Sequence, residues 1–149
     1  MKPNFLFFCY ESTADFAKAA TYFSLYHTDY PKSDQSAAAL RLSGLYFWGS
    51  DQNEKAEAAM LRYLSLFPQD RAHAEKDLLD FYSSQNEYDR HMRYLLEARA
   101  QKGVSFSDYL DYTLKLADLK ESHTGKEATQ FWNEAKGLLE KYSKILSES

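Results

Sequence analysis

The chain has 149 residues, of which 44% are hydrophobic and 27% charged, and its formal net charge is −4. These values are typical of one soluble globular domain with a sizeable core. Acidic and basic residues are interleaved without a basic run, which excludes the electrostatic footprint of a nucleic-acid-binding protein. No run approaches about 18 apolar residues, so we expect no membrane span.

The N-terminal segment MKPNFLFFCY is too short for a signal peptide and has no small-residue cleavage site. We expect it to form the first helix, and the alternative is the remnant of a targeting signal. The compartment stays open between cytoplasm and periplasm. The single cysteine, Cys9, excludes an intramolecular disulfide and a cysteine-based zinc site. Glycine and proline are scarce, which favours helices over a β-sandwich with many turns.

Apolar residues at helical spacing predict an all-α chain of about eight helices with short connections, in which neighbouring helices are antiparallel. The expected helices span residues 4–11, 13–30, 34–49, 52–67, 71–84, 87–101, 106–121 and 125–147. Helix-start patterns of the capping-box kind occur at residues 12–15, 51–54, 105–108 and 124–127. The expected helix-stop signals are Pro31, Pro68 and Gly103.

A repeat relates the helices in pairs. Ala19, Ala56, His91 and Ala128 recur at intervals of 37, 35 and 37 residues. A large apolar residue follows each of them four positions later, as Phe23, Met60, Leu95 and Trp132. A small residue lets two helices approach closely, and the large residue fills the space between them. We therefore expect one domain over residues 1–149, with repeats near 1–33, 34–69, 70–104 and 105–149.

The second helix pair carries the most specific pattern, which consists of Leu40, Gly44, Phe47, Ala56, Met60 and Pro68. It resembles the tetratricopeptide repeat, with its Leu-Gly-x₂-Tyr, Ala-x₃-Phe and Pro positions. The first pair matches through Leu6, Tyr10, Ala19, Phe23 and Pro31, the third through Leu78, Tyr82, His91 and Leu95, and the fourth through Leu116, Leu119, Ala128 and Trp132. The ending Tyr-Pro-Lys-Ser is similar to repeats of bacterial envelope-assembly and secretion proteins.

The resemblance implies a right-handed α-solenoid of about four antiparallel helix pairs. The chain also departs from the family pattern. Its spacing exceeds the usual 34 residues or so. Phe7, Leu79 and Leu116 replace the small glycine of the first helix in the other three pairs, and His91 replaces a small alanine. These departures are expected to loosen or reorient the helix pairs concerned.

No catalytic or metal-binding arrangement stands out. The four histidines, His27, His73, His91 and His123, form no His-Glu-x-x-His pair and have no second metal ligand at helical spacing. General acid–base catalysis needs a positioned partner, and the sequence offers none. We therefore expect no enzyme, no cofactor and no metal site. A helical hydrolase or metal enzyme is a further alternative.

In the family that the chain resembles, the first helix of each pair lines a concave groove that binds peptides. The resemblance assigns seven partner-binding residues: Arg41, Leu45, Trp48, His73, Lys76, Asp80 and Thr113. Arg41 and Lys76 would place two adjacent positive charges in the groove, with Leu45 and Trp48 as an apolar patch. The expected partner is a protein or peptide that is acidic and carries one aromatic or aliphatic anchor. The alternative is that these side chains are solvated or packed between repeats.

The two ends of the chain differ. The last helix is amphipathic and is expected to cap the solenoid with a polar outer face. The first helix is apolar all round, so something is expected to cover it, and Phe5 and Phe8 are the candidate contact surface. The covering element would be a preceding repeat, a second copy of the chain through self-association, or a partner protein.

The leading functional hypothesis is a non-enzymatic adaptor or assembly factor that holds a partner in its groove. The alternative is a structural spacer within a longer solenoid of an envelope-assembly or secretion protein. Such a spacer would make its contacts through the N-terminal helix rather than through the groove.

Overall fold

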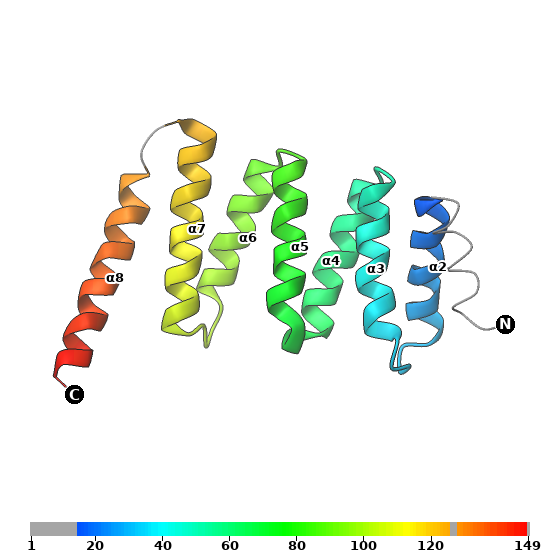
Figure 1. Ribbon diagram of the computed structural model, residues 1–149, viewed down its shortest axis with the longest axis horizontal. Coiled ribbons are helices and arrows are strands. Elements are labelled where there is room, and N and C mark those ends of the chain that lie inside the picture. Colours follow the sequence, from blue (N-terminus) through cyan, green and yellow to red (C-terminus); the bar gives the residue numbers. More distant parts are fainter. Residues whose placement is uncertain (1–14, 126–127, 149) are drawn as a thin grey trace. The chain divides into compact units, whose positions relative to one another are not determined.

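The computed structural model describes residues 15–125 and 128–148, and its regular elements within these ranges are all helical (Figure 1). Its α-helices are α2 (Phe16–Asp29), α3 (Ser36–Gly49), α4 (Asn53–Leu66), α5 (Arg71–Ser84), α6 (Tyr88–Ala100), α7 (Phe106–Thr124) and α8 (Thr129–Ser147). A 3₁₀ turn, Pro68–Asp70, joins α4 to α5. Every boundary lies within four residues of the predicted one, so these seven predicted helices are confirmed. The predicted helix 4–11, with Phe5 and Phe8, lies outside the described residues.

The described chain divides into two compact units, and the boundary falls within α5, between Phe81 and Tyr82. In the first unit α2 packs on α3 and α3 packs on α4. In the second unit α6 packs on α7 and α7 packs on α8. Consecutive helices therefore pack on one another inside each unit, and in the first unit α3 also contacts α5. This division does not decide whether residues 1–149 form one domain, so the single domain expected from the sequence stays a prediction.

The helix ends follow local chemistry that the sequence only partly predicted. Asp15 caps α2, because its side chain accepts a hydrogen bond from the backbone N–H of Lys18 at 3.2 Å. Ser105 caps α7 in the same way through the N–H of Asp108 at 3.0 Å, as predicted. The two prolines also act as predicted. α2 and α4 each end two residues before a proline, which cannot continue a helix.

Two predicted start signals are wrong. α4 begins after Gln52 without a side-chain cap, because Asp51 lies in the left-handed region at φ 59° and belongs to the turn. Thr124 does not start α8 but ends α7, where its hydroxyl donates to the carbonyl oxygen of Lys120 at 2.8 Å. Gly125 then closes α7 at φ 63°, a conformation that favours glycine.

The small residues of the repeat are buried where helices cross. Ala19, Ala56 and Ala128 are buried, as are the large partners Phe23, Met60 and Leu95, whereas Trp132 is half-buried. Gly44 shows how close α3 and α4 come, since a β-carbon added there would lie 3.2 Å from Cγ of Met60 and 3.5 Å from Cβ of Ala59. A core cluster then joins these helices to α5 through Leu40, Ala59, Tyr63 and Ala74.

Alanine substitutions at two helix glycines are expected to change the free energy of unfolding in opposite directions. Gly44→Ala is expected to lower the free energy of unfolding by about 1 kcal/mol, because overpacking against Met60 outweighs the better helix propensity of alanine. Gly137→Ala in α8 is expected to raise it by about 0.5–1 kcal/mol, because nothing lies within 4 Å of the added carbon. Urea denaturation followed by circular dichroism measures both. Equal shifts of the same sign would contradict the close α3–α4 crossing.

The apolar stripe of α8 is covered over only part of its length in the described structure. Ala135 is buried, and Phe131, Trp132 and Leu138 are half-buried. The stripe continues into residues that are exposed, namely Leu139, Tyr142, Ile145 and Leu146. Phe106, at the start of α7, stacks on Tyr142 with ring centroids 4.9 Å apart. α7 begins at this ring pair, so it leaves the last turn of α8 uncovered.

Candidate functional site

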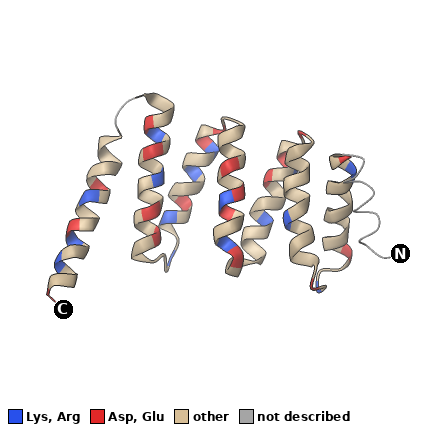
Figure 2. Cartoon of the chain, in the orientation of Figure 1, with Lys and Arg blue, Asp and Glu red and all other residues tan. Residues whose placement is uncertain are grey.

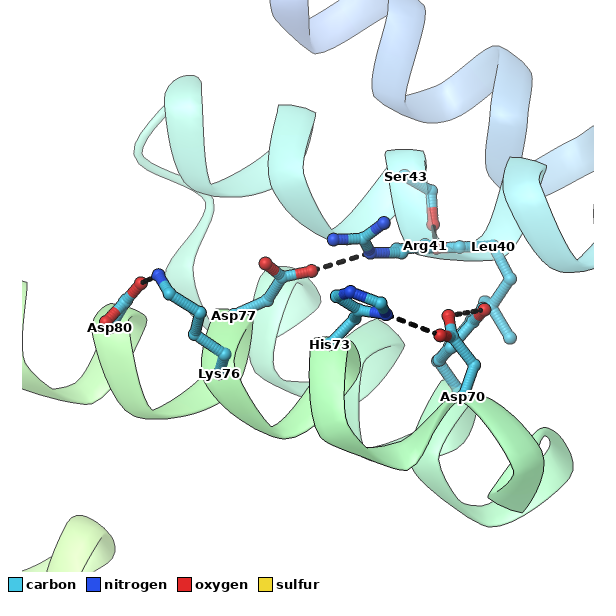
Figure 3. A network of polar contacts seen from close by, with 9 residues as sticks. Leu40, Arg41, Ser43, Asp70, His73, Lys76, Asp77 and Asp80 are labelled. Carbon is cyan, nitrogen blue, oxygen red and sulfur yellow. Dashed lines mark hydrogen bonds and ion pairs between the residues drawn. The ribbon is translucent and has the colours of Figure 1, made fainter.

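The candidate site lies in the first unit, where α3 and α5 meet (Figure 3). Nε of Arg41 donates to Oδ2 of Asp77 at 2.7 Å, and both side chains are partly buried. This hydrogen bond raises the pKa of Arg41 above its ordinary value. The pair connects residues 36 positions apart in the sequence. Two helices separated in the chain by α4 are therefore in direct contact, and Arg41 is engaged within the fold.

The other two basic groups of the predicted site also have carboxylate neighbours on their own segment. Nζ of Lys76 donates to Oδ2 of Asp80 at 2.6 Å, with 73% and 55% of the two side chains exposed. Nδ1 of His73 lies 2.9 Å from Oδ1 of Asp70. The face thus combines charges of both signs, and each of the two positive charges expected from the sequence, Arg41 and Lys76, has a carboxylate beside it. Figure 2 shows the same interleaving of acids and bases along α5.

A hydrogen bond from α4 fixes the turn that precedes α5. The Tyr63 hydroxyl donates to Oδ2 of Asp70 at 2.7 Å. Burial, followed by this hydrogen bond, raises the pKa of Tyr63 to about 12. The hydrogen bonds to Tyr63 and His73 lower the pKa of Asp70. Asp70 therefore holds the 3₁₀ turn and the first turn of α5 in place against α4.

The apolar members of the predicted site are half-buried. Trp48 lies edge-on to Phe81, with ring centroids 5.7 Å apart, and this contact also joins α3 to α5. Leu45 lies one turn earlier on α3 and is half-buried as well. Part of each side chain thus stays accessible while the rest packs, which suits a fixed apolar contact point.

Thr113 is placed differently from the other six predicted residues. It lies in the second unit and is fully buried. Its hydroxyl donates to the carbonyl oxygen of Tyr109 at 2.8 Å and accepts from Nη1 of Arg99 at 3.1 Å. A partner could not reach it in this conformation. Thr113 is therefore a packing residue, and we correct the candidate set accordingly.

Sequence reasoning missed three residues of the site: Tyr63, Asp70 and Asp77. Asp77 directly follows Lys76 and has no signal of its own that would connect it to Arg41. Asp70 did carry a signal, because it follows Pro68 at the position where a turn passes into α5 and where a carboxylate favours the helix start. The spacer alternative depends on Phe5 and Phe8, so its contact surface lies outside the described residues.

Two negative findings apply to residues 15–125 and 128–148. No group of three or more His, Cys, Asp or Glu side chains there is arranged to hold a metal ion. No helix in the same ranges combines the length and the hydropathy needed to cross a membrane.

His91 occupies the position of a small alanine in the repeat pattern and is buried against Tyr82, with ring centroids 6.0 Å apart. Burial, and then the positive charge of Lys115, lower the pKa of His91 below its ordinary value of 6.5. The unfolded chain therefore binds a proton here more readily than the folded chain does. The contribution of this neutral histidine to stability is complete above pH 6.5 and is lost as the pH falls through its folded-state pKa.

We expect the free energy of unfolding to fall between pH 6.5 and the lower pKa of folded His91, and His91→Gln to remove this slope. Denaturant unfolding at a series of pH values measures it. Asp15 and Asp70, whose pKa values lie below 3.8, lose their contributions only at lower pH, so the two effects separate. His123→Gln is the control. A slope that survives His91→Gln unchanged would show that another group titrates.

Comparison of the chain with protein-family models, with curated proteins and with solved structures gave no match. The resemblance to the tetratricopeptide repeat therefore rests on the residue pattern of this chain.

Proposed function

We propose that the protein is a non-enzymatic protein–protein interaction module of the tetratricopeptide-like solenoid type, and that it acts as an adaptor or assembly factor. We further propose that the partner binds on the face formed by α3 and α5. The observation that carries the proposal is the Arg41–Asp77 ion pair, which holds the two helices together on this face. Lys76 and Asp80 remain exposed on the same face.

The charges of this face argue for a partner with both signs of charge. Arg41 pairs with Asp77, Lys76 pairs with Asp80, and a third carboxylate, Asp70, lies beside His73. A purely acidic peptide would meet a carboxylate beside each base, and like charges in contact oppose binding. A segment that offers an acidic group to Lys76 and a basic group to Asp80 fits better. Its apolar anchor would contact Leu45 and Trp48, as expected from the sequence.

Different residues of the face carry stability and binding. Arg41 and Asp77 are partly buried, and removal of either would leave the other without its charged partner. Lys76 and Asp80 are mostly exposed, and ion pairs of this kind add little to stability. Variants of Lys76 and Asp80 therefore report on binding, whereas variants of Arg41 would report on folding as well.

The test is affinity capture from the native source with the full chain, followed by titration of each captured protein against variants. The double variant Lys76→Ala/Asp80→Ala is expected to weaken the affinity about tenfold, the effect of losing two charged contacts. The matched control is Asp111→Ala/Lys115→Ala, which removes an exposed i,i+4 ion pair of the same kind on α7. Equal affinities of the wild type and the Lys76/Asp80 variant would contradict the binding face.

A further inference from the structure

A pocket of about 230 Å³ lies within the first unit between α2 and α4, with side chains of α3 as its floor. Its polar lining comes from Ser24, His27 and Thr28 of α2 and from Lys55 and Arg62 of α4. None of these residues belongs to the α3–α5 face described above. The pocket is therefore a separate surface feature, and it is independent of the proposed function.

The two basic side chains of the pocket differ from those of the α3–α5 face. Lys55 and Arg62 lie seven residues apart, so they project from one side of α4 about two turns apart. Neither makes an ion pair with a carboxylate in the described part of the chain. Nζ of Lys55 instead donates to Oε1 of Gln52 at 2.8 Å and lies 5.4 Å from the ring centroid of Phe47. The ammonium group is thus positioned near the apolar floor without being neutralised.

His27 adds a buried polar group to the same pocket. It is only 5% exposed, and its Nδ1 lies 2.8 Å from Oγ of Ser36. Its Nε2 has no hydrogen-bond partner among the described residues. Nδ1 also lies 3.2 Å from the carbonyl oxygen of Ser36, so a proton on Nδ1 satisfies both contacts and leaves Nε2 as an acceptor.

The hydroxyl groups of Ser24 and Thr28 complete the polar lining, one turn apart on α2. The Thr28 hydroxyl donates to the carbonyl oxygen of Ser24 at 2.9 Å and also has lone pairs, whereas the Ser24 hydroxyl can still donate. Acidic residues do occur on both helices, but Asp29, Glu54 and Glu57 are not among the residues that line the pocket. The lining is therefore rich in hydrogen-bond donors and carries positive charge.

We propose that this pocket binds an oxyanion, either a carboxylate or a phosphate group, carried on a short apolar stem. Lys55 and Arg62 supply the charge, Ser24 supplies a neutral donor, and the ring of Phe47 contacts the stem. Charge-assisted hydrogen bonds to an anion are about twice as strong as neutral ones, so the two bases are expected to dominate the affinity.

The experiment is a titration of the full chain, followed by the amide resonances in nuclear magnetic resonance spectra at low ionic strength, where exposed charges are least screened. The probes are butyrate, inorganic phosphate and the uncharged butyramide. Butyrate or phosphate is expected to give saturable shifts at Ser24, Thr28, Lys55 and Arg62, and butyramide none. Tighter binding of butyrate assigns a carboxylate as the ligand group, and tighter binding of phosphate assigns a phosphate.

Variants of the two basic residues test whether these side chains bind the anion. Lys55→Gln and Arg62→Gln are each expected to weaken binding about fivefold, as for one partly screened ion pair, and the double variant is expected to abolish saturation. Both side chains are exposed, so the fold is expected to persist, and the undisturbed spectrum of the free variant checks this. Lys76→Gln is the control, with unchanged affinity. Shifts spread over all basic residues, or full binding by the double variant, would overturn the proposal.

Discussion

Phe81→Ala is expected to lower the free energy of unfolding by about 3–5 kcal/mol, the range for truncation of a buried aromatic side chain. Phe81 is 2% exposed and is among the largest fully buried side chains of the described chain. Its ring lies against the edge of Trp48 on α3. Truncation removes this contact and leaves a cavity between α3 and α5 at the proposed binding face.

Denaturant unfolding followed by circular dichroism measures the loss. Phe106→Ala is the matched control, because Phe106, at the start of α7, is 37% exposed and stacks on Tyr142 of α8. Its truncation is expected to cost about 1 kcal/mol, from a surface ring contact and partial burial. Phe81→Leu keeps most of the volume and is expected to fall between the two. If Phe81→Ala cost no more than Phe106→Ala, the packing of α5 on α3 would be in error.

A second large loss in the free energy of unfolding is expected when Arg99, in the second unit, is replaced. Its Nη1 donates to Oε2 of Glu134 and to Oγ1 of Thr113, both at 3.1 Å, and its side chain is 15% exposed. The guanidinium carbon also lies 5.0 Å from the ring centroid of Tyr109, whose hydroxyl donates to Oε1 of Glu134 at 2.7 Å. One side chain of α6 therefore connects α7 and α8.

Arg99→Ala is expected to lower the free energy of unfolding by about 3 kcal/mol, because it leaves the Glu134 carboxylate without its cation and the buried Thr113 hydroxyl without a donor. The same denaturation experiment measures it. The double variant Arg99→Ala/Glu134→Gln is expected to recover part of the loss, since the isolated charge is gone. The exposed ion pair between Asp111 and Lys115 is the comparison. Asp111→Asn is expected to lower the free energy of unfolding by less than about 1 kcal/mol. Similar costs at Arg99 and Asp111 would contradict this network.

The helices were predictable because the signals that place them are local. Periodic apolar residues and the two prolines set the boundaries of α2 to α5, and Ser105 marked the start of α7. The start of α4 was missed by one residue because Asp51, which looks like a cap, takes a left-handed turn conformation instead. That choice depends on how the whole turn fits between α3 and α4, which the tetrapeptide pattern does not contain.

The pairing of charges could not be predicted in the same way. Arg41 was singled out by its position on the helix, but its partner Asp77 lies on another helix that packs against α3 only in the folded chain. Thr113 is assigned to the groove only by the resemblance to the repeat family. A threonine hydroxyl can bond the carbonyl one turn earlier, so this side chain tolerates full burial.

Hydrogen exchange of the full chain, with and without a captured partner, shows whether the partner binds across α3 and α5. Slowed exchange on binding is expected to be concentrated in residues 41–48 and 73–80, because these segments carry the face. Protection confined to other helices, with residues 41–48 and 73–80 unchanged, would contradict it.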